Sequence, residues 1–283
     1  GLEAPAPVKL GLAPGEHTID LDGNLSHFVY EFGDGSANIT TQDGFLSHSY
    51  TQPGTYLVAV TAVDITGLST RFEKQIVVKE NQAPIIAHVP VYGNLSEPAP
   101  VRLAFVPHEG AIDDQYIQRW RYNFGDGSPI IETTEGYLEH DYLFPGMFTA
   151  IITAYDPYGL SSSYSIPLEI KANQPPVLTD FDLHIPEEAA PIIASIDMVG
   201  YASDSDGSLE LFEYDWGDGT VTQTNVGYFE HSYLQGGEYQ VSVRVQDDKG
   251  TWSLPVKKSA TVRSNIPPTA TVALLTQNVY APT

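Results

Sequence analysis

One motif recurs at a fixed interval, and this interval constrains the fold more than any other feature of the chain. A Gly-Asp-Gly triplet begins at positions 33, 125 and 217, so the period is 92 residues twice over. The motifs NQAP, NQPP and NIPP begin at Asn81, Asn173 and Asn265, with the same spacing. A chain that repeats itself at a constant interval consists of similar structural units in series.

The residues around each triplet predict β-strands. Aromatic runs flank it in FVYEFGDGS, WRYNFGDGS and FEYDWGDGT, and this pattern is typical of hairpins because Gly and Asp tolerate a positive φ. Each copy continues with a His-x-Tyr motif. A segment of alternating apolar and polar residues follows, the period of a strand with one buried face. These segments are Pro53–Asp64, Pro145–Asp156 and Gly236–Asp247. Seven or so short strands in roughly 90 residues describe an Ig-like β-sandwich.

In this order the motifs Y-x-[FW]-G-D-G, H-x-Y and P-G-x-[YF] resemble those of the PKD domain, an Ig-like sandwich of cell-surface and secreted proteins. The third copy departs from the pattern at Gly236–Gly237, where Gly-Gly replaces Pro-Gly, and it has one residue fewer before His231. We predict an all-β chain of tandem Ig-like (PKD-like) β-sandwiches in a linear array. The predicted domains are 1–80 (lacking its first strand), 81–172 and 173–264, and 265–283 is the linker and first strand of a following domain.

The net charge of the chain restricts the classes of molecule that it can bind. It carries 36 acidic against 13 basic residues, a formal net charge of −23, which repels nucleic acid and anionic membrane surfaces and favours a cation. It has no cysteine, so disulfides and thiolate sites are excluded. No run of 18 apolar residues is present, so we expect no membrane insertion. The resemblance implies an extracellular or cell-surface location, where the sequons at Asn24, Asn38 and Asn94 could carry glycans.

The two ends of the sequence fit one another. Residues 1–12 match Ser96–Phe105 inside the second repeat, whereas 265–283 match the segment that precedes it. We predict that the C-terminal segment supplies the first strand of another unit, either in a covalent tandem repeat or as a donor strand. Such a heterologous contact builds an open fibre of copies joined head to tail. The alternative is an arbitrary fragment. The assembly strand comprises Thr269, Thr271, Val272, Leu274, Leu275 and Val279, and the acceptor comprises Val8, Leu10 and Leu12.

Carboxylate and amide residues recur where the loops of neighbouring units meet. Their oxygens suit Ca²⁺, which takes six to eight oxygen ligands, and calcium at the linker end is also what the resemblance implies. The other interpretation is that these residues only cap turns. The second repeat is the weakest candidate, because Ile112 stands where the first Asp is expected. The candidate ligands are Asp20, Asp22, Asp64, Asn81, Asp114, Asp156, Asn173, Asp204, Asp206 and Asp247.

The sequence favours a structural role without catalysis. The Gly-Asp-Gly carboxylates recur three times in register, which is typical of a turn, and no hydrolase, zincin or phosphate-loop motif is present. We expect the histidines of the His-x-Tyr motifs to pack locally and the tyrosines to form a tyrosine corner. We therefore predict the repeat unit of an extracellular filament, stalk or surface layer. The alternative is a spacer or a glycan- or polymer-binding array of a secreted hydrolase or adhesin, with exposed aromatic residues at the domain period.

Overall fold

The structure is a computed structural model that describes residues 2–273. Within this range the only helices are two single 3₁₀ turns, Pro14–Glu16 and Pro107–Glu109, and the regular structure is otherwise β-strand. No helix in the described range is long and apolar enough to cross a membrane. The predicted all-β fold class is confirmed.

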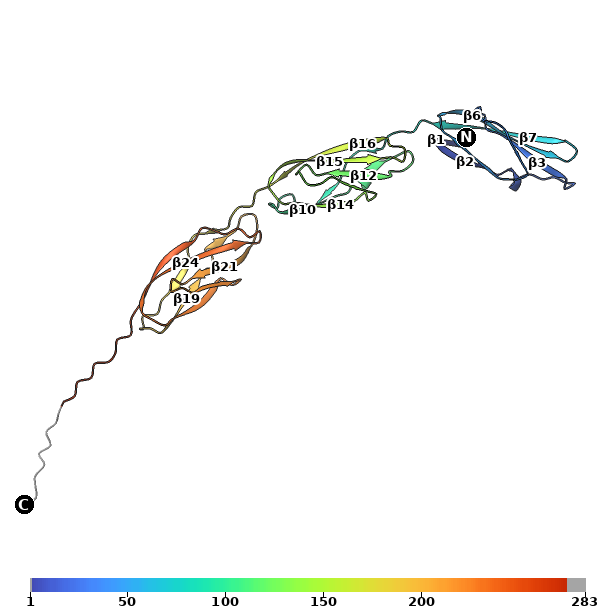
Figure 1. Ribbon diagram of the computed structural model, residues 1–283. Coiled ribbons are helices and arrows are strands. Elements are labelled where there is room, and N and C mark those ends of the chain that lie inside the picture. The colour runs from blue at the N-terminus through green and yellow to red at the C-terminus, as the bar shows by residue number, and fades with distance from the viewer. Residues whose placement is uncertain (1, 274–283) are drawn as a thin grey trace, which may run out of the picture. The chain divides into compact units, whose positions relative to one another are not determined.

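The first repeat folds as two facing sheets. A five-stranded sheet has the order β1-β7-β6-β3-β4, and a second sheet consists of β2 and β5 (Figure 1). The strands are β1 (Leu2–Pro5), β2 (Val8–Leu12), β3 (Leu25–Glu31), β4 (Ile39–Thr41), β5 (Leu46–Tyr50), β6 (Gly54–Asp64) and β7 (Ser69–Lys79).

The second repeat has a four-stranded sheet, β13-β12-β15-β16, with the smaller sheets β14-β10-β9 and β11-β8. Its strands are β8 (Ile85–Ile86), β9 (Val91–Tyr92), β10 (Val101–Phe105), β11 (Ala111–Ile112), β12 (Arg119–Asn123), β13 (Ile131–Thr133), β14 (Leu138–Tyr142), β15 (Gly146–Tyr155) and β16 (Ser161–Ile170).

The third repeat has the same plan, with sheets β22-β21-β24-β25, β18-β19-β23 and β17-β20. Its strands are β17 (Val177–Leu178), β18 (Asp182–His184), β19 (Ile192–Asp197), β20 (Ala202–Ser203), β21 (Leu209–Asp215), β22 (Val221–Thr224), β23 (Tyr228–Tyr233), β24 (Gly237–Asp247) and β25 (Val256–Val262).

The turn chemistry acts as the sequence predicts. The first Gly-Asp-Gly lies between β3 and β4, which pair antiparallel, and Gly33 and Gly35 have φ values of 76° and 86°. Glycine occupies this left-handed region without the steric penalty of a side chain. The long strands β6, β15 and β24 begin at the second residue of each Pro-Gly or Gly-Gly pair. The predicted hairpins and long strands are therefore confirmed.

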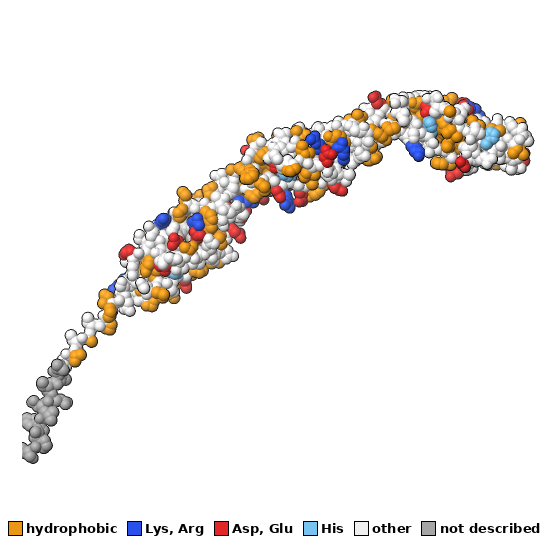
Figure 2. All heavy atoms as spheres, in the orientation of Figure 1, with side chains coloured by type: hydrophobic (Ala, Val, Ile, Leu, Met, Phe, Trp, Pro, Cys, Tyr) orange, Lys and Arg blue, Asp and Glu red, His pale blue; other side chains and the backbone are white. Residues whose placement is uncertain are grey.

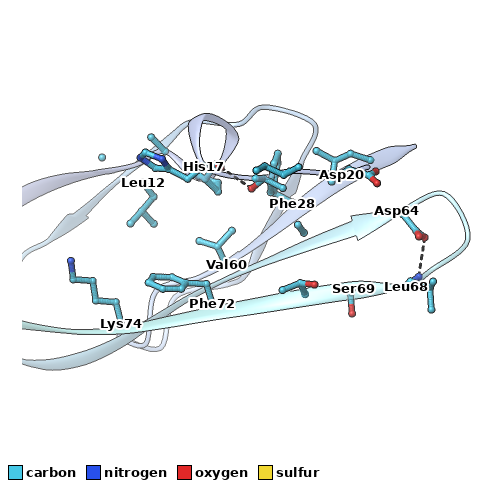
Figure 3. Close-up of a pocket in the computed structure, with 18 residues that line it drawn as sticks. Leu12, His17, Asp20, Phe28, Val60, Asp64, Leu68, Ser69, Phe72 and Lys74 are labelled. Carbon is cyan, nitrogen blue, oxygen red and sulfur yellow. Dashed lines mark hydrogen bonds between the residues drawn. The ribbon is translucent and has the colours of Figure 1, made fainter. Parts of the chain in front are cut away.

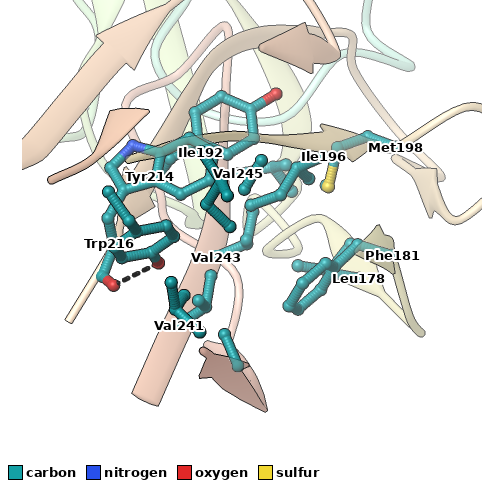
Figure 4. Close-up of a cluster of buried hydrophobic side chains, with 14 of the residues drawn as sticks. Leu178, Phe181, Ile192, Ile196, Met198, Tyr214, Trp216, Val241, Val243 and Val245 are labelled. Carbon is teal, nitrogen blue, oxygen red and sulfur yellow. Dashed lines mark hydrogen bonds between the residues drawn. The ribbon is translucent and has the colours of Figure 1, made fainter. Parts of the chain in front are cut away.

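The alternation along each long strand builds the core between the sheets. In the third repeat Val241, Val243 and Val245 of β24 are fully buried. They pack in one cluster with Trp216 of the Gly-Asp-Gly turn and with Phe181, which lies just before β18 (Figure 4). The first strand of this repeat, β17–β18, thus contributes directly to the core.

The first repeat differs at this point. Among its described residues nothing corresponds to β8–β9 or β17–β18, and β2 pairs only with β5. Its N-terminal strand β1 instead pairs parallel with β7, with Leu2 opposite Ile76. The other repeats have single parallel bridges at the equivalent place, Pro98–Lys171 and Ala189–Arg263. The predicted domain 1–80, which matched residues 1–12 to Ser96–Phe105, did not include this parallel pairing.

Candidate functional site

Each Gly-Asp-Gly aspartate is held by the histidine of the following His-x-Tyr motif. The Nε2 to Oδ2 distance is 2.6 Å between His48 and Asp34, and it is 2.7 Å in both other repeats. The imidazole of His48 stacks on Phe32 with ring centroids 3.8 Å apart. Burial by itself would raise the pKa of Asp34, but hydrogen bonds from Ser36 and His48 outweigh it and lower this pKa to about 2. The pair clamps the turn to the next strand, as the local interpretation of the histidines predicts.

The tyrosines of the same motifs anchor the sandwich. The hydroxyl of Tyr50 donates to the carbonyl of Phe32 at 2.9 Å, and that of Tyr233 donates to the carbonyl of Trp216 at 2.7 Å. Both rings are buried, and burial raises the pKa of Tyr50 to about 12. The predicted tyrosine corner is confirmed in the first and third repeats.

A polar cluster forms where the linker of the second repeat meets the end of its long strand. The amide of Asn81 donates to Asp156 Oδ2 at 2.5 Å, and the backbone N–H of Gln82 donates to Asp114 Oδ2 at 3.1 Å. The other oxygen of Asp156 accepts the backbone N–H groups of Tyr158 and Leu160, each at 2.8 Å. Asp156 is only 1% exposed, so the linker asparagine satisfies a buried carboxylate.

The third repeat reproduces this cluster. The amide of Asn173 donates to Asp247 Oδ2 at 2.7 Å, and the backbone N–H of Gln174 donates to Asp206 Oδ2 at 3.0 Å. Asp247 is again 1% exposed. The linker is thus tied to its own domain by one side-chain amide and one backbone amide in both repeats.

Several oxygens of these two clusters, and of the corresponding loop of the first repeat, are buried without a hydrogen-bond partner. They are Asp20 Oδ2, Asn24 Oδ1, Asp113 Oδ1, Asn173 Oδ1, Asp204 Oδ2 and Asp206 Oδ1. Burial and the neighbouring Asp206 raise the pKa of Asp204. Unpaired buried oxygens are costly, and a cation relieves this cost. In the described part of the chain, however, no group of three or more His, Asp or Glu side chains is arranged to hold a metal ion.

A second recurring feature is an exposed aromatic residue at the start of β5, β14 and β23. Phe45 and Tyr137 immediately precede β5 and β14, and Tyr228 is the first residue of β23; they are 61%, 45% and 49% exposed. The hydroxyl of Tyr137 donates to Glu139 at 2.6 Å, and that of Tyr228 donates to Glu230 at 2.8 Å. On the face that Figure 2 presents, acidic side chains are scattered over the folded parts and do not form one patch.

Comparison with known families gives a direct result. Two models, both described as PKD domain, match residues 13–79 and 187–262 and residues 89–166. The chain belongs to the PKD domain family. The matches fall in three regions, one in each repeat, so the predicted family and its tandem arrangement are confirmed.

Named relatives give a similar picture. Human polycystin-1 is 26% identical over 207 residues, which are 72% of this chain but only 4% of that protein. The PKD1 domain of Vibrio anguillarum Epp is 29% identical and covers 33% of this chain and 99% of that domain, with a TM-score of 0.28. The PKD1 domain of the Vibrio cholerae metalloprotease PrtV is 25% identical and covers 32% of this chain and 100% of that domain, with a TM-score of 0.27.

The first PKD domain has only part of the polar cluster that Asn81 and Asn173 complete in the second and third domains. Asp20, Asp22 and Asn24 lie together, with the Asn24 amide 3.3 Å from Asp22, and a hydrogen bond with Asp22 raises the pKa of Asp20. Asp64 accepts the N–H groups of its own turn, at Thr66 and Leu68. No linker asparagine reaches Asp64 in the described chain, and Asp64 is half-buried where its two counterparts are fully buried.

The predicted acceptor residues lie in strand β2 of the first PKD domain. Val8, Leu10 and Leu12 are half-buried and pack against the edge of its core. Leu12 also lines a groove of about 940 Å³ that contains Phe28, Val60 and Phe72 (Figure 3). Of the predicted assembly strand, Thr269, Thr271 and Val272 are exposed and outside any strand. Leu274, Leu275 and Val279 lie outside the described residues.

The structure adds Asp113, which was not among the predicted ligands, to the second cluster. Asp113 Oδ2 accepts the N–H two residues ahead, at Gln115, as Asp204 Oδ1 does at Asp206, and each has one buried unpaired oxygen. Asp113 therefore stands where the sequence comparison placed Ile112. The loop of the second repeat is one residue shorter before Asp114, and this hid the match at constant spacing.

Proposed function

We propose that the chain is the repeat unit of an extracellular filament, stalk or surface layer, without catalytic activity, and that copies join head to tail. The observation that carries this proposal is the polar tie between linker and domain. It is made twice within the chain, by Asn81 on Asp156 and by Asn173 on Asp247. Asn265 begins the same linker motif as Asn81 and Asn173. Asp64 is the counterpart of Asp156 and Asp247 in the first domain, so the proposed contact is between Asn265 of one copy and Asp64 of the next.

The proposed units are the three domains at 1–80, 81–172 and 173–264. A buried hydrogen bond between the linker asparagine and the aspartate fixes the first strand of a domain to that domain. Each unit is therefore a stable folded domain. In linear arrays the total stability is close to a sum of unit and neighbour contributions. Such a molecule functions through its length and stiffness, and the extracellular location is part of the same proposal.

Calcium is the proposed cofactor of the linker ends. Asn173, Asp204, Asp206 and Asp247 would hold it in the third domain, because they gather oxygen donors of which three have no partner. Asn81, Asp113, Asp114 and Asp156 form the equivalent set in the second. When bound, the ion neutralises neighbouring carboxylates and relieves their unpaired oxygens. The protein residues fix the linker to the strand end with or without the ion.

One observation favours a second function, the binding of a glycan or another polymer. Phe45, Tyr137 and Tyr228 expose an aromatic ring at the domain period, as the alternative hypothesis predicts. Replacing all three by Ala should lower retention of the chain on an insoluble polysaccharide such as chitin without changing its melting temperature. Equal retention of the two proteins would remove this alternative.

Sedimentation velocity over a wide concentration range tests the proposed assembly. Head-to-tail association should give a series of increasing sedimentation coefficients, and negative-stain images should contain threads. A protein of two copies joined end to end tests the covalent form. The domain that forms across its junction should unfold at a higher temperature than the first domain of a single copy. A monomer at every concentration, together with a two-copy protein that unfolds like one copy, would exclude both forms.

A further inference from the structure

The core of the first PKD domain is open where the cores of the other two are closed. Val60 and Ala62 of β6 are half-buried, although their counterparts in β15 and β24 are fully buried. These counterparts are Ile152 and Ala154 in the second domain and Val243 and Val245 in the third. Leu12 is likewise half-buried, in contrast to Phe105 and Ile196. Apolar residues that remain partly exposed at core positions form a surface that another segment can bind.

In the complete domains the first strand provides this cover. Leu178 and Phe181 belong to the buried cluster of the third domain (Figure 4), and Val89 is 8% exposed at the position equivalent to Phe181. In the first domain the same space is the groove between Leu12, Phe28, Val60 and Phe72 (Figure 3). The groove therefore lies where the first strand lies in the other two domains.

The size of the filling residue varies inversely with that of a residue on the last strand. The third domain has the large Phe181 on its first strand and the small Val256 on its last strand. The second domain has the small Val89 and the large Tyr164 at the corresponding positions, each 92 residues earlier. In the first domain Phe72 takes the place of Tyr164 and is 67% exposed. The residue of the C-terminal segment at the same spacing is Ala273. A small residue beside Phe72 keeps the combined volume of the pair, as close packing requires.

The polar end of the groove indicates the register of the strand. Asp64 lines the groove (Figure 3) and is the counterpart of Asp156 and Asp247, which receive the linker asparagines. Lys74 also lines the groove. Its counterpart Lys258 bonds the backbone carbonyl of Phe181, so Lys74 is placed to bond a carbonyl of the entering strand.

We propose that this groove binds residues Asn265–Ala273 of a second copy in one fixed register. The amide of Asn265 bonds Asp64, and Thr269 pairs with Ile19, because Val177 pairs with Ser203 and Ile85 with Ile112 at these places. Ile19 is 85% exposed in the single chain, and Thr269 is also exposed. This inference rests on the proposed head-to-tail function and specifies its contact.

Disulfide trapping tests the register, since the protein has no cysteine of its own. The full chain with Thr269→Cys and Ile19→Cys should form a ladder of covalent oligomers on mild oxidation, because directly paired residues lie within disulfide reach. The control chain carries Thr269→Cys and Ile39→Cys, which places the second thiol on the exposed strand β4. We expect the first chain to cross-link at least roughly tenfold faster than the control.

The two possible failures are distinguishable. If both chains cross-link at the same rate and the unmodified chain sediments as oligomers, the proposed register is wrong while self-association of the chain stands. If neither chain cross-links and the protein sediments as a monomer, both proposals are overturned.

Charge changes at the proposed Asn265–Asp64 contact give a second test. Asn265→Asp places two carboxylates together and should weaken association by roughly tenfold or more. Adding Asp64→Asn restores an amide–carboxylate pair and should recover the affinity. Asn225→Asp, which adds the same charge at an exposed site, should leave association unchanged. An Asn265→Asp chain that associates as tightly as the unmodified chain contradicts the proposed contact.

Discussion

Asn173 donates its side-chain amide to Asp247 at 2.7 Å and to the Thr251 hydroxyl at 2.8 Å. A linker residue thereby closes a hydrogen-bond network around a carboxylate that is 1% exposed. Two segments 74 residues apart in sequence are joined by this contact, which makes the start of the third domain part of its fold.

Removing this amide should destabilise the third domain. Asn173→Ala leaves the buried Asp247 carboxylate without one donor, and the expected loss is about 1–3 kcal/mol of unfolding free energy. Denaturant unfolding followed by tryptophan fluorescence measures it, because Trp216 and Trp252 both lie in this domain. Gln174→Ala removes only an exposed side chain and keeps the backbone N–H, so it should cost less than about 0.5 kcal/mol. Equal stability of the two variants would contradict the role of the amide.

The histidine clamp predicts a stability loss in acid. Hydrogen bonds from Ser128 and His140 outweigh the effect of burial and lower the pKa of Asp126 from 3.8 to about 2. A carboxylate with a lowered folded-state pKa stabilises the fold above its unfolded pKa, and this contribution is lost as the pH falls toward 2. After allowance for solvent screening we expect about 1 kcal/mol from this group.

Unfolding free energy measured between about pH 6 and pH 2 tests this sign. Asp126→Asn keeps an acceptor for Ser128 but cannot titrate, so its stability should fall less steeply in acid than that of the unmodified chain. Glu80→Gln, at an exposed position, provides the reference slope. An acid dependence of Asp126→Asn as steep as that of the unmodified chain would rule out the clamp as its source.

The tyrosine corner should contribute measurably to stability. Tyr233→Phe removes the buried hydroxyl that donates to the Trp216 carbonyl, at an expected cost of about 1–3 kcal/mol. The matched control is Tyr239→Phe, whose hydroxyl bonds the Gln235 carbonyl at an exposed site and should cost less than about 0.5 kcal/mol. Thermal or urea unfolding of both variants decides the point, and a cost at Tyr233 no larger than at Tyr239 refutes it.

Calcium should raise the melting temperature if the linker ends bind it. At a free concentration one hundred times the dissociation constant, a single site adds about 2.7 kcal/mol. Calorimetric titration with CaCl₂ should detect binding that a chelator reverses. Asp204→Asn should weaken it, whereas Asp34→Asn, in a turn of the first domain, should not. No heat of binding and no change in melting temperature would exclude a calcium site.

Features set by local chemistry were predictable from the sequence. The hairpins at Gly33 and Gly125, the long strands and the hydroxyl bond of Tyr50 all follow from turn residues, alternation and motif order. These depend on short-range backbone preferences, which the residue types report directly.

Features that depend on distant strands were harder to predict. The parallel pairing of β1 was missed because Leu2–Pro5 has no alternation and ends in a proline, so only the position of β7 defines it. Asp113 was missed because a loop one residue shorter breaks the constant spacing. The exposure of Phe45 was expected only as a property of an alternative function, since aromatic residues in these strands are equally typical of the core.

The inverse sizes at the first and last strands have a consequence for folding. Three sibling domains on one chain can exchange equivalent strands, which is a characteristic misfolding route of repeat proteins. Phe181 needs the space beside Val256, and in the first domain Phe72 occupies that space. The strand that bears Phe181 therefore fits poorly beside Phe72 or Tyr164, so steric exclusion disfavours its exchange into the first or second domain.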